Sequence, residues 1–135
     1  MLEKCSFSYA LIRLVPRVER EEFINVGVIV YCPARSFLQA VAELDKARLA
    51  AVAPDLSLEE IEPHLEAIRM ICRGGQDAGA IGSLSLSARF HWLTAPRSTV
   101  IQTSMVHTGM CDDPETVLCD LLNKMVRIRQ SSQVL

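Results

Sequence analysis

The side chains that could do chemistry in this sequence lie on or beside predicted strands. Residues 22–31, EFINVGVIVY, are typical of a buried strand, yet Asn25 and Gly27 interrupt it. Asn is depleted from strands and needs hydrogen-bond partners when buried, and Gly weakens a strand interior. An asparagine there could orient a ligand, and a glycine leaves room for close approach of a backbone. These two residues therefore define the first candidate site.

Pairing of neighbouring strands extends this site. If residues 6–15 pair antiparallel with residues 23–31, with the centre of the connection near Glu19, Arg13 lies opposite Asn25. In the same register Leu11 lies opposite Gly27. Arg13 would supply a forked hydrogen-bond donor to an anion or a peptide.

A third strand would complete a polar row. If residues 37–44 pair with Tyr31 opposite Phe37, Glu43 falls beside Asn25. A slip of one residue would dissolve the row, because register decides which face each side chain occupies. The functional interpretation is a small anion or peptide site. The structural one is that Arg13 and Glu43 pair while Asn25 satisfies a loop backbone.

A second cluster follows in the last third of the chain. Arginine and histidine side chains that converge on a groove could bind phosphate or carboxylate. In the alternative, the aromatic residues are core and the arginines lie on the surface. The cluster comprises Arg89, His91, Trp92, Arg97 and His107, and the aromatic residues of the alternative are Phe90 and Trp92.

Cysteine chemistry is less supported. His107, Cys111 and Cys119 are close in sequence, but a nucleophilic cysteine needs an orienting group and a structural zinc needs four ligands. Glu22 belongs to the run EREE, which favours a solvated segment or an acidic edge that faces a partner. We expect no catalytic residue, no metal and no cofactor.

Composition limits the partner classes. The net charge of −2 gives no basic excess for binding nucleic acid, and no stretch is long and apolar enough to span a membrane. Five cysteines without a paired motif, and an N-terminus without a secretory pattern, predict free thiols in the cytoplasm. A mean hydropathy of +0.22 favours a protein partner or a homo-oligomer.

The elements that position these residues follow from periodicity. Three short strands at 6–15, 23–31 and 37–44 predict an antiparallel meander, with the even-numbered face from Ile24 to Cys32 as core. Residues 99–110 have strand composition with a break near Thr103 or Ser104.

Helices are marked by their caps. Asp45, Ser57, Ser83 or Ser85, and Asp113 each precede an apolar helical pattern. Pro63 implies either a kink or a helix that begins there. The glycine-rich stretch 74–83 is a linker rather than a phosphate cradle, since no strand precedes it. The last helix is expected to bury Leu118, Leu121, Leu122, Met125 and Ile128, with Arg127 and Arg129 near its end.

The predicted fold class is α+β, one domain over residues 1–135, with an antiparallel meander sheet packed with about four helices. The chain resembles the bacterial family known as domain of unknown function 3037. The resemblance lies in YALIRLVP (9–16), EEFINVGVIVYCP (21–33), ARFHWLTAPRSTVIQ (88–102) and VHTGMCDDPE (106–115). Its motif positions here are Arg13, Glu22, Asn25, Gly27, Arg89, Arg97, His107 and Gly109.

The resemblance implies no activity and no catalytic residue. Members are often encoded beside a kinase-like protein of the HipA type, which implies an accessory or antitoxin-like role. We therefore expect a non-enzymatic, cytoplasmic domain that binds a protein partner. The alternative is a small-ligand or anion-binding protein, or an enzyme, with a pocket formed by Arg, Asn and His.

Overall fold

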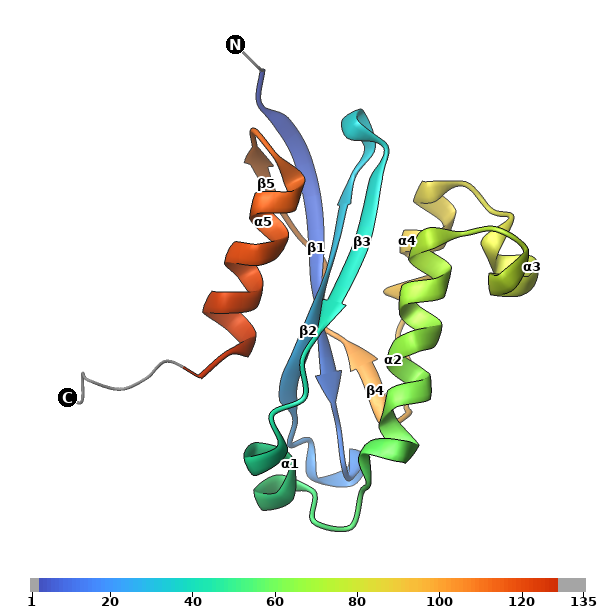
Figure 1. The fold of residues 1–135 in the computed structure, drawn as a ribbon. Coiled ribbons are helices and arrows are strands. Elements are labelled where there is room, and N and C mark those ends of the chain that lie inside the picture. The colour runs from blue at the N-terminus through green and yellow to red at the C-terminus, as the bar shows by residue number, and fades with distance from the viewer. Residues whose placement is uncertain (1–2, 129–135) are drawn as a thin grey trace, which may run out of the picture.

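An antiparallel sheet organises the chain. The computed structural model describes residues 3–128, and within that range it contains five strands and five α-helices (Figure 1). The strand order is β3-β2-β1-β4, and β5 pairs with the other half of β1. The strands are β1 (Cys5–Leu14), β2 (Ile24–Cys32), β3 (Phe37–Ala42), β4 (Ile101–Thr103) and β5 (His107–Cys111). The predicted α+β class and the meander of the first three strands are confirmed.

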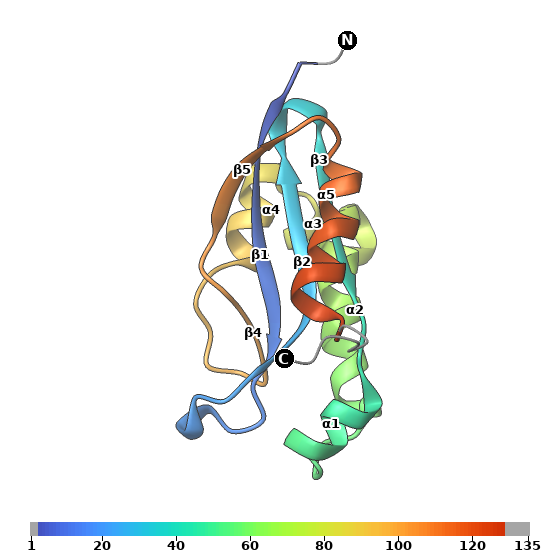
Figure 2. The ribbon, with the colours of Figure 1, turned by 90° about the vertical axis from the view of Figure 1, so that its left-hand side faces the viewer.

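Helices cover both faces of the sheet. Figure 1 shows α5 on one side of the strands and α2 and α4 on the other, and Figure 2 shows the sheet behind α5. Between residues 3 and 128, no helix combines the length and apolar character that crossing a membrane requires. The helices are α1 (Lys46–Val52), α2 (Leu58–Arg73), α3 (Gly79–Gly82), α4 (Leu86–Leu93) and α5 (Pro114–Leu121).

The two faces bury two separate cores. The α2-side core packs Ile12, Leu14 and Ile29 of the sheet against α1, α2 and α4. The α5-side core packs Val28, Val30 and Cys32 against α5. Each fully buried Ile, Leu or Val contributes about 1.5–3 kcal/mol to folding, so both layers are needed for stability.

A β-bulge in β2 explains why both faces are apolar. Arg13 pairs with Asn25, but the preceding residue Ile12 pairs with Gly27, so Val26 is an extra residue without a partner in β1. The prediction of one apolar, even-numbered face is therefore wrong. The bulge turns Val26 into the α2-side core, whereas Val28 faces the α5-side core.

The helix starts agree with the caps read from the sequence. The side chains of Asp45, Ser57, Ser85 and Asp113 each accept a hydrogen bond from a backbone N–H in the first turn. Pro63 lies inside α2, so the helix does not begin there. The glycine-rich stretch forms a 3-10 turn and the short α3, which makes five helices instead of about four.

The last helix changes its pitch at its end. After α5, residues Leu122–Val126 form a π-helical turn, and Arg127 N–H donates to Leu122 O at 3.0 Å. A π turn holds one residue more than an α turn, so it rotates the following side chains. Val126 is therefore buried, while Met125 and Ile128, which the sequence placed in the core, are exposed. Arg129 lies outside the described residues.

Candidate functional site

The first predicted contact of the polar row is present. Arg13 and Asn25 face each other across β1 and β2, as the sequence predicted. Leu11 faces Val28, so its predicted pairing with Gly27 is wrong, because the bulge at Val26 shifts the register by one residue beyond that point. The guanidinium of Arg13 lies 4.0 Å from the centre of the Phe23 ring, a cation–π contact.

The space at Gly27 is used by the chain itself. A Cβ atom built on Gly27 would lie 2.5 Å from Val41 O and 2.9 Å from Ile12 Cδ1. Both distances are shorter than a Cβ atom tolerates, so only glycine allows β3 to lie this close to β2 here. The backbone that approaches Gly27 is that of β3.

Glu43 reaches a different partner. Tyr31 pairs with Leu38 instead of Phe37, so the third strand is shifted by one residue from the predicted register. Glu43 N–H donates to Val26 O at 2.8 Å, and its carboxylate accepts from Arg127 Nε at 3.0 and 3.1 Å. The predicted adjacency of Glu43 and Asn25 on paired strands is therefore wrong.

Asn25 and Glu43 nevertheless act on the same segment. Asn25 Nδ2 donates to Met125 O at 3.1 Å, and Arg48 Nη1 of α1 donates to Val126 O at 3.1 Å. Together with the Glu43–Arg127 pair, these contacts form what we name the C-terminal anchor: Asn25, Glu43 and Arg48 holding Met125, Val126 and Arg127. Hydrogen bonds from side chains here satisfy carbonyls at a helix end, where orphan acceptors occur.

The electrostatics of the anchor follow from this geometry. Hydrogen bonds from Arg127 lower the pKa of Glu43 below its ordinary value. Arg127 Nη1 also donates to Asn123 Oδ1 at 2.6 Å, which fixes the guanidinium against its own helix. Both members of the ion pair are about half exposed, so the pair orients the helix end more than it stabilises the fold.

Two buried polar atoms remain unbonded beside the anchor. Within residues 3–128, Arg13 Nε and Asn25 Oδ1 are the buried side-chain atoms without a hydrogen-bond partner. One is a donor and the other an acceptor, and they belong to facing residues. A buried polar atom of this kind costs about 1–3 kcal/mol when it is unpaired, so substitution of these residues removes a cost as well as contacts.

Arg89 of the second cluster is built into the fold. It is only 9% exposed, and its guanidinium donates to Ile71 O and Cys72 O at 2.8 Å and to Leu84 O at 3.0 Å. These carbonyls lie at the end of α2 and before α4, so Arg89 joins the two helices. The expectation that Arg89 lies on the surface is therefore wrong.

Arg97 serves the end of α4 in a similar way. Its guanidinium donates to Trp92 O at 2.6 Å and to Leu93 O at 3.0 Å, and it lies 4.3 Å from the centre of the Trp92 ring. Trp92 is 41% exposed, so the prediction that it is core is wrong. Phe90 is buried, as predicted.

The remaining predicted residues lie elsewhere. His107 is exposed on β5 and stacks on Tyr9, with ring centres 5.2 Å apart. Tyr9 packs on the α5-side core, whereas Arg97 caps a helix of the other face, so the second cluster does not form one site. Glu22 is exposed and accepts from Arg20 Nε at 2.6 Å, which lowers the pKa of Glu22.

An apolar groove lies between α2, α4 and β4. It has a volume of about 270 Å³, and Trp92 and Arg97 form part of its wall. Its lining includes Ile71, Leu93 and Ile101 of the α2-side core. The lining residues are His64, Ala67, Ile68, Ile71, Trp92, Leu93, Arg97, Thr99, Ile101, Gln102 and Thr103.

Burial makes two of the five cysteines poor candidates for a nucleophile. Burial raises the pKa of Cys72 to about 12, and burial also raises the pKa of Cys111. A thiol with a raised pKa is a poor nucleophile at neutral pH. Among residues 3–128, no group of three His, Cys, Asp or Glu side chains is arranged to hold a metal ion.

Sequence reasoning missed the role of Arg48 and most of that of Arg127. Arg48 is 78 residues from its acceptor Val126, and Glu43 is 84 residues from Arg127. No local pattern connects positions that far apart. The groove was also missed, because its wall comes from three elements that meet only in the folded chain.

The fold and these sites define an α+β domain with helices on both faces of its sheet, whose arginine clusters mainly hold the helix ends. Residues 9–126 match the family described as Protein of unknown function (DUF3037), so the chain belongs to that family. The resemblance read from the sequence is thereby confirmed. No match to the chain was found among curated proteins or among solved structures.

Proposed function

We propose that this chain is a non-enzymatic accessory domain of the bacterial cytoplasm that binds a protein partner through the apolar groove. The observation that carries the proposal is Trp92, a residue 41% exposed that lines the apolar groove. Exposed tryptophan beside a pocket is typical of the residues that dominate protein interfaces. The HipA-type kinase-like proteins encoded beside family members are the first partner to test.

The state of the arginines supports a protein partner over an anion. Arg89 and Arg97 donate to backbone carbonyls, and Arg97 also stacks on Trp92. Their guanidinium groups are engaged within the fold, so neither is set out to receive a phosphate or carboxylate. The groove is therefore suited to an apolar side chain of a partner segment, with Gln102 and Thr103 among the residues that line it.

The test uses one helix position at the groove. Ala67 is exposed on α2 and lines the groove, so Ala67→Arg would obstruct it with little effect on helix stability. Ala50→Arg is the matched control, because Ala50 is an exposed helical alanine on α1 that does not line the groove. We expect purified HipA-type protein to bind the wild type and the control, and to bind the Ala67 variant at least tenfold more weakly. Equal binding by all three proteins would remove the groove from the proposal.

The second candidate function is binding of a small apolar ligand in the same groove. Its volume of about 270 Å³ is close to the lower end of small-molecule pockets. A ligand at a hundred times its dissociation constant would add about 2.7 kcal/mol to the free energy of unfolding. A thermal-shift screen of nucleotides, metabolites and fatty acids tests this function, and a flat response across all classes would count against it.

A further inference from the structure

We propose that β5 pairs with the β5 strand of a second copy of this chain, so that two sheets join antiparallel about a two-fold axis at Thr108. The inference goes beyond the proposed function, because no residue of β5 lines the groove. It starts from the free edge of the sheet. Within the described residues, β5 pairs only with β1, and Figure 2 shows β5 at the margin of the sheet with β1 on its inner side.

This edge carries an unusual share of exposed apolar surface. Met105 is 81% exposed, Val106 43% and Met110 62%. An unpaired strand edge offers a row of backbone donors and acceptors, and proteins commonly protect such edges with lysine, proline or other charged residues. Residues 98–111 contain no lysine, arginine, aspartate, glutamate or proline, so this edge lacks that protection.

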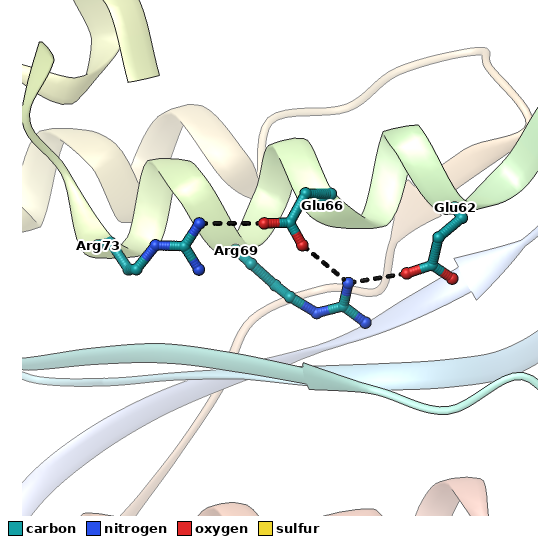
Figure 3. A network of polar contacts seen from close by, with 4 residues as sticks. All are labelled: Glu62, Glu66, Arg69 and Arg73. Atoms are coloured by element: carbon teal, nitrogen blue, oxygen red, sulfur yellow. Dashed lines mark hydrogen bonds and ion pairs between the residues drawn. The ribbon is translucent and has the colours of Figure 1, made fainter. Parts of the chain in front are cut away.

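The opposite edge of the sheet, at β3, lies beside a network of charged side chains. Along α2, Arg69 pairs with Glu62 at 2.9 Å and with Glu66 at 3.2 Å, and Arg73 pairs with Glu66 at 3.0 Å. Figure 3 shows this network beside the strands, and Arg69 and Arg73 line a hollow with residues 38–40 of β3. A strand that approached β3 would have to displace solvated charges. The two edges therefore differ, and β5 is the one left open.

The order of side chains along β5 suits antiparallel pairing with the β5 strand of a second copy. Ser6 pairs with Met110 and Ser8 with Thr108, so alternation places Val106, Thr108 and Met110 on the face turned away from the α5-side core. In an antiparallel pair centred on Thr108, Val106 of each copy lies opposite Met110 of the other, and Thr108 lies opposite itself. Apolar pairs and threonine pairs directly opposite each other stabilise antiparallel sheets.

Charge selects a second copy over a charged partner strand. His107 is the only ionisable side chain in residues 98–110, and it would lie opposite Gly109 of the other copy. The two histidines are therefore not directly opposed. A charged partner strand would find no counter-charge along this edge, whereas two neutral edges meet without repulsion.

The interface is expected to be weak. A pair of short strands and three apolar side chains falls below the roughly 1,600 Å² of a standard stable interface. We therefore expect a dissociation constant of about 1–100 µM and a dimer that forms as concentration rises. Sedimentation velocity of the full chain over about 2–500 µM covers this range.

A charge-swap at Thr108 tests the axis. Thr108→Lys and Thr108→Glu would each place like charges opposite one another across the axis, and each is expected to weaken self-association at least tenfold. An equimolar mixture of the two variants is expected to form a heterodimer at least as tight as the wild-type dimer. This rescue requires both variants to be folded, so it separates loss of the interface from loss of the fold.

The control variant is Gln39→Lys, an exposed residue of β3 at the opposite edge. It is expected to leave the dimer unchanged. A wild-type chain that stays monomeric throughout the concentration range would overturn the proposal. So would a dimer that persists in both Thr108 variants, or one that Gln39→Lys abolishes.

Discussion

Arg13 and Asn25 face each other across β1 and β2, and each holds one buried polar atom that, within residues 3–128, has no hydrogen-bond partner. The other end of the Asn25 amide donates to Met125 O, and the Arg13 guanidinium lies over Phe23. The pair therefore connects the bulged part of the sheet to the end of the last helix. Its contribution can be measured by substitution.

Asn25→Ala is expected to lower the free energy of unfolding by about 1 kcal/mol, because it removes the donor to Met125 O. Arg13→Met removes the unbonded Nε while it keeps an apolar stem against Phe23, so it should cost less than about 1 kcal/mol. Urea unfolding of both variants and of the double variant provides the measurement. A larger loss for Arg13→Met than for Asn25→Ala would contradict this account.

Gly27→Ala is expected to destabilise the chain by about 2–4 kcal/mol, because the added Cβ meets the backbone oxygen of Val41 at 2.5 Å. Gly109→Ala is the comparison, since its Cβ would meet the end of the Phe7 ring, a side chain that can shift. Its loss should be clearly smaller. Similar denaturation midpoints for the two variants would show that β3 can move away from Gly27.

Arg89→Met is expected to cost about 3 kcal/mol or more, because it leaves three backbone carbonyls at the junction of α2 and α4 without their charged donor. The loss of stability for Arg89→Lys should lie between those of the wild type and Arg89→Met, since one ammonium group cannot reproduce the planar fork of a guanidinium. Arg73→Met is the control, because its ion pair with Glu66 is exposed and screened by solvent, so its loss should be much smaller than that of Arg89. Thermal unfolding of the three variants measures their order of stability.

Acid should weaken the C-terminal anchor through Glu43. The pKa of Glu43 is lowered in the folded chain by the hydrogen bonds from Arg127, so its contribution is present above the unfolded pKa of about 4.3 and is lost as pH falls through the folded value. The difference in stability between wild type and Glu43→Gln should therefore be largest near neutral pH and vanish in strong acid. Urea unfolding between about pH 3 and pH 7 tests the sign, and a difference that grows on acidification would refute it.

Alkylation should follow exposure and thiol pKa. Cys119 is exposed, whereas Cys72 is buried with a pKa of about 12. Iodoacetamide at mildly alkaline pH is expected to modify Cys119 at least about tenfold faster than Cys72 in the folded chain. Peptide mass spectrometry over time measures both rates, and the same reaction in urea, where the rates should converge, is the control.

Much of the fold could be predicted from local patterns. Caps at Asp45, Ser57 and Asp113 mark helix starts because their side chains bond to the next turn, an effect confined to a few residues. The Arg13–Asn25 contact was also predicted, since it needs only the length of one connection. The bulge at Val26 was missed, although the unbroken apolar run from Val28 to Cys32 indicates a strand buried on both faces.

Other features depend on distant parts of the chain. A π turn at residues 122–126 leaves Met125 exposed and Val126 buried, and the α-helical period alone gives the wrong residue. The one-residue slip of β3 separates Glu43 from the predicted row, and its partner Arg127 lies 84 residues away. The hydrogen bonds of Arg89 and Arg97 to backbone carbonyls could not be predicted, because those carbonyls become neighbours of the arginines only after the helices form.

The position of α5 and the C-terminal anchor late in the chain sets the order in which the fold is completed during synthesis. A ribosome makes β1, β2 and β3 first, and those three strands can pair with one another as soon as they emerge. Val28, Val30 and Cys32 then remain exposed to solvent, because α5 and its π turn, which bury them, are among the last described residues to be translated. During that interval the nascent sheet shows a bare apolar face, so this is the stage at which the chain most needs a chaperone.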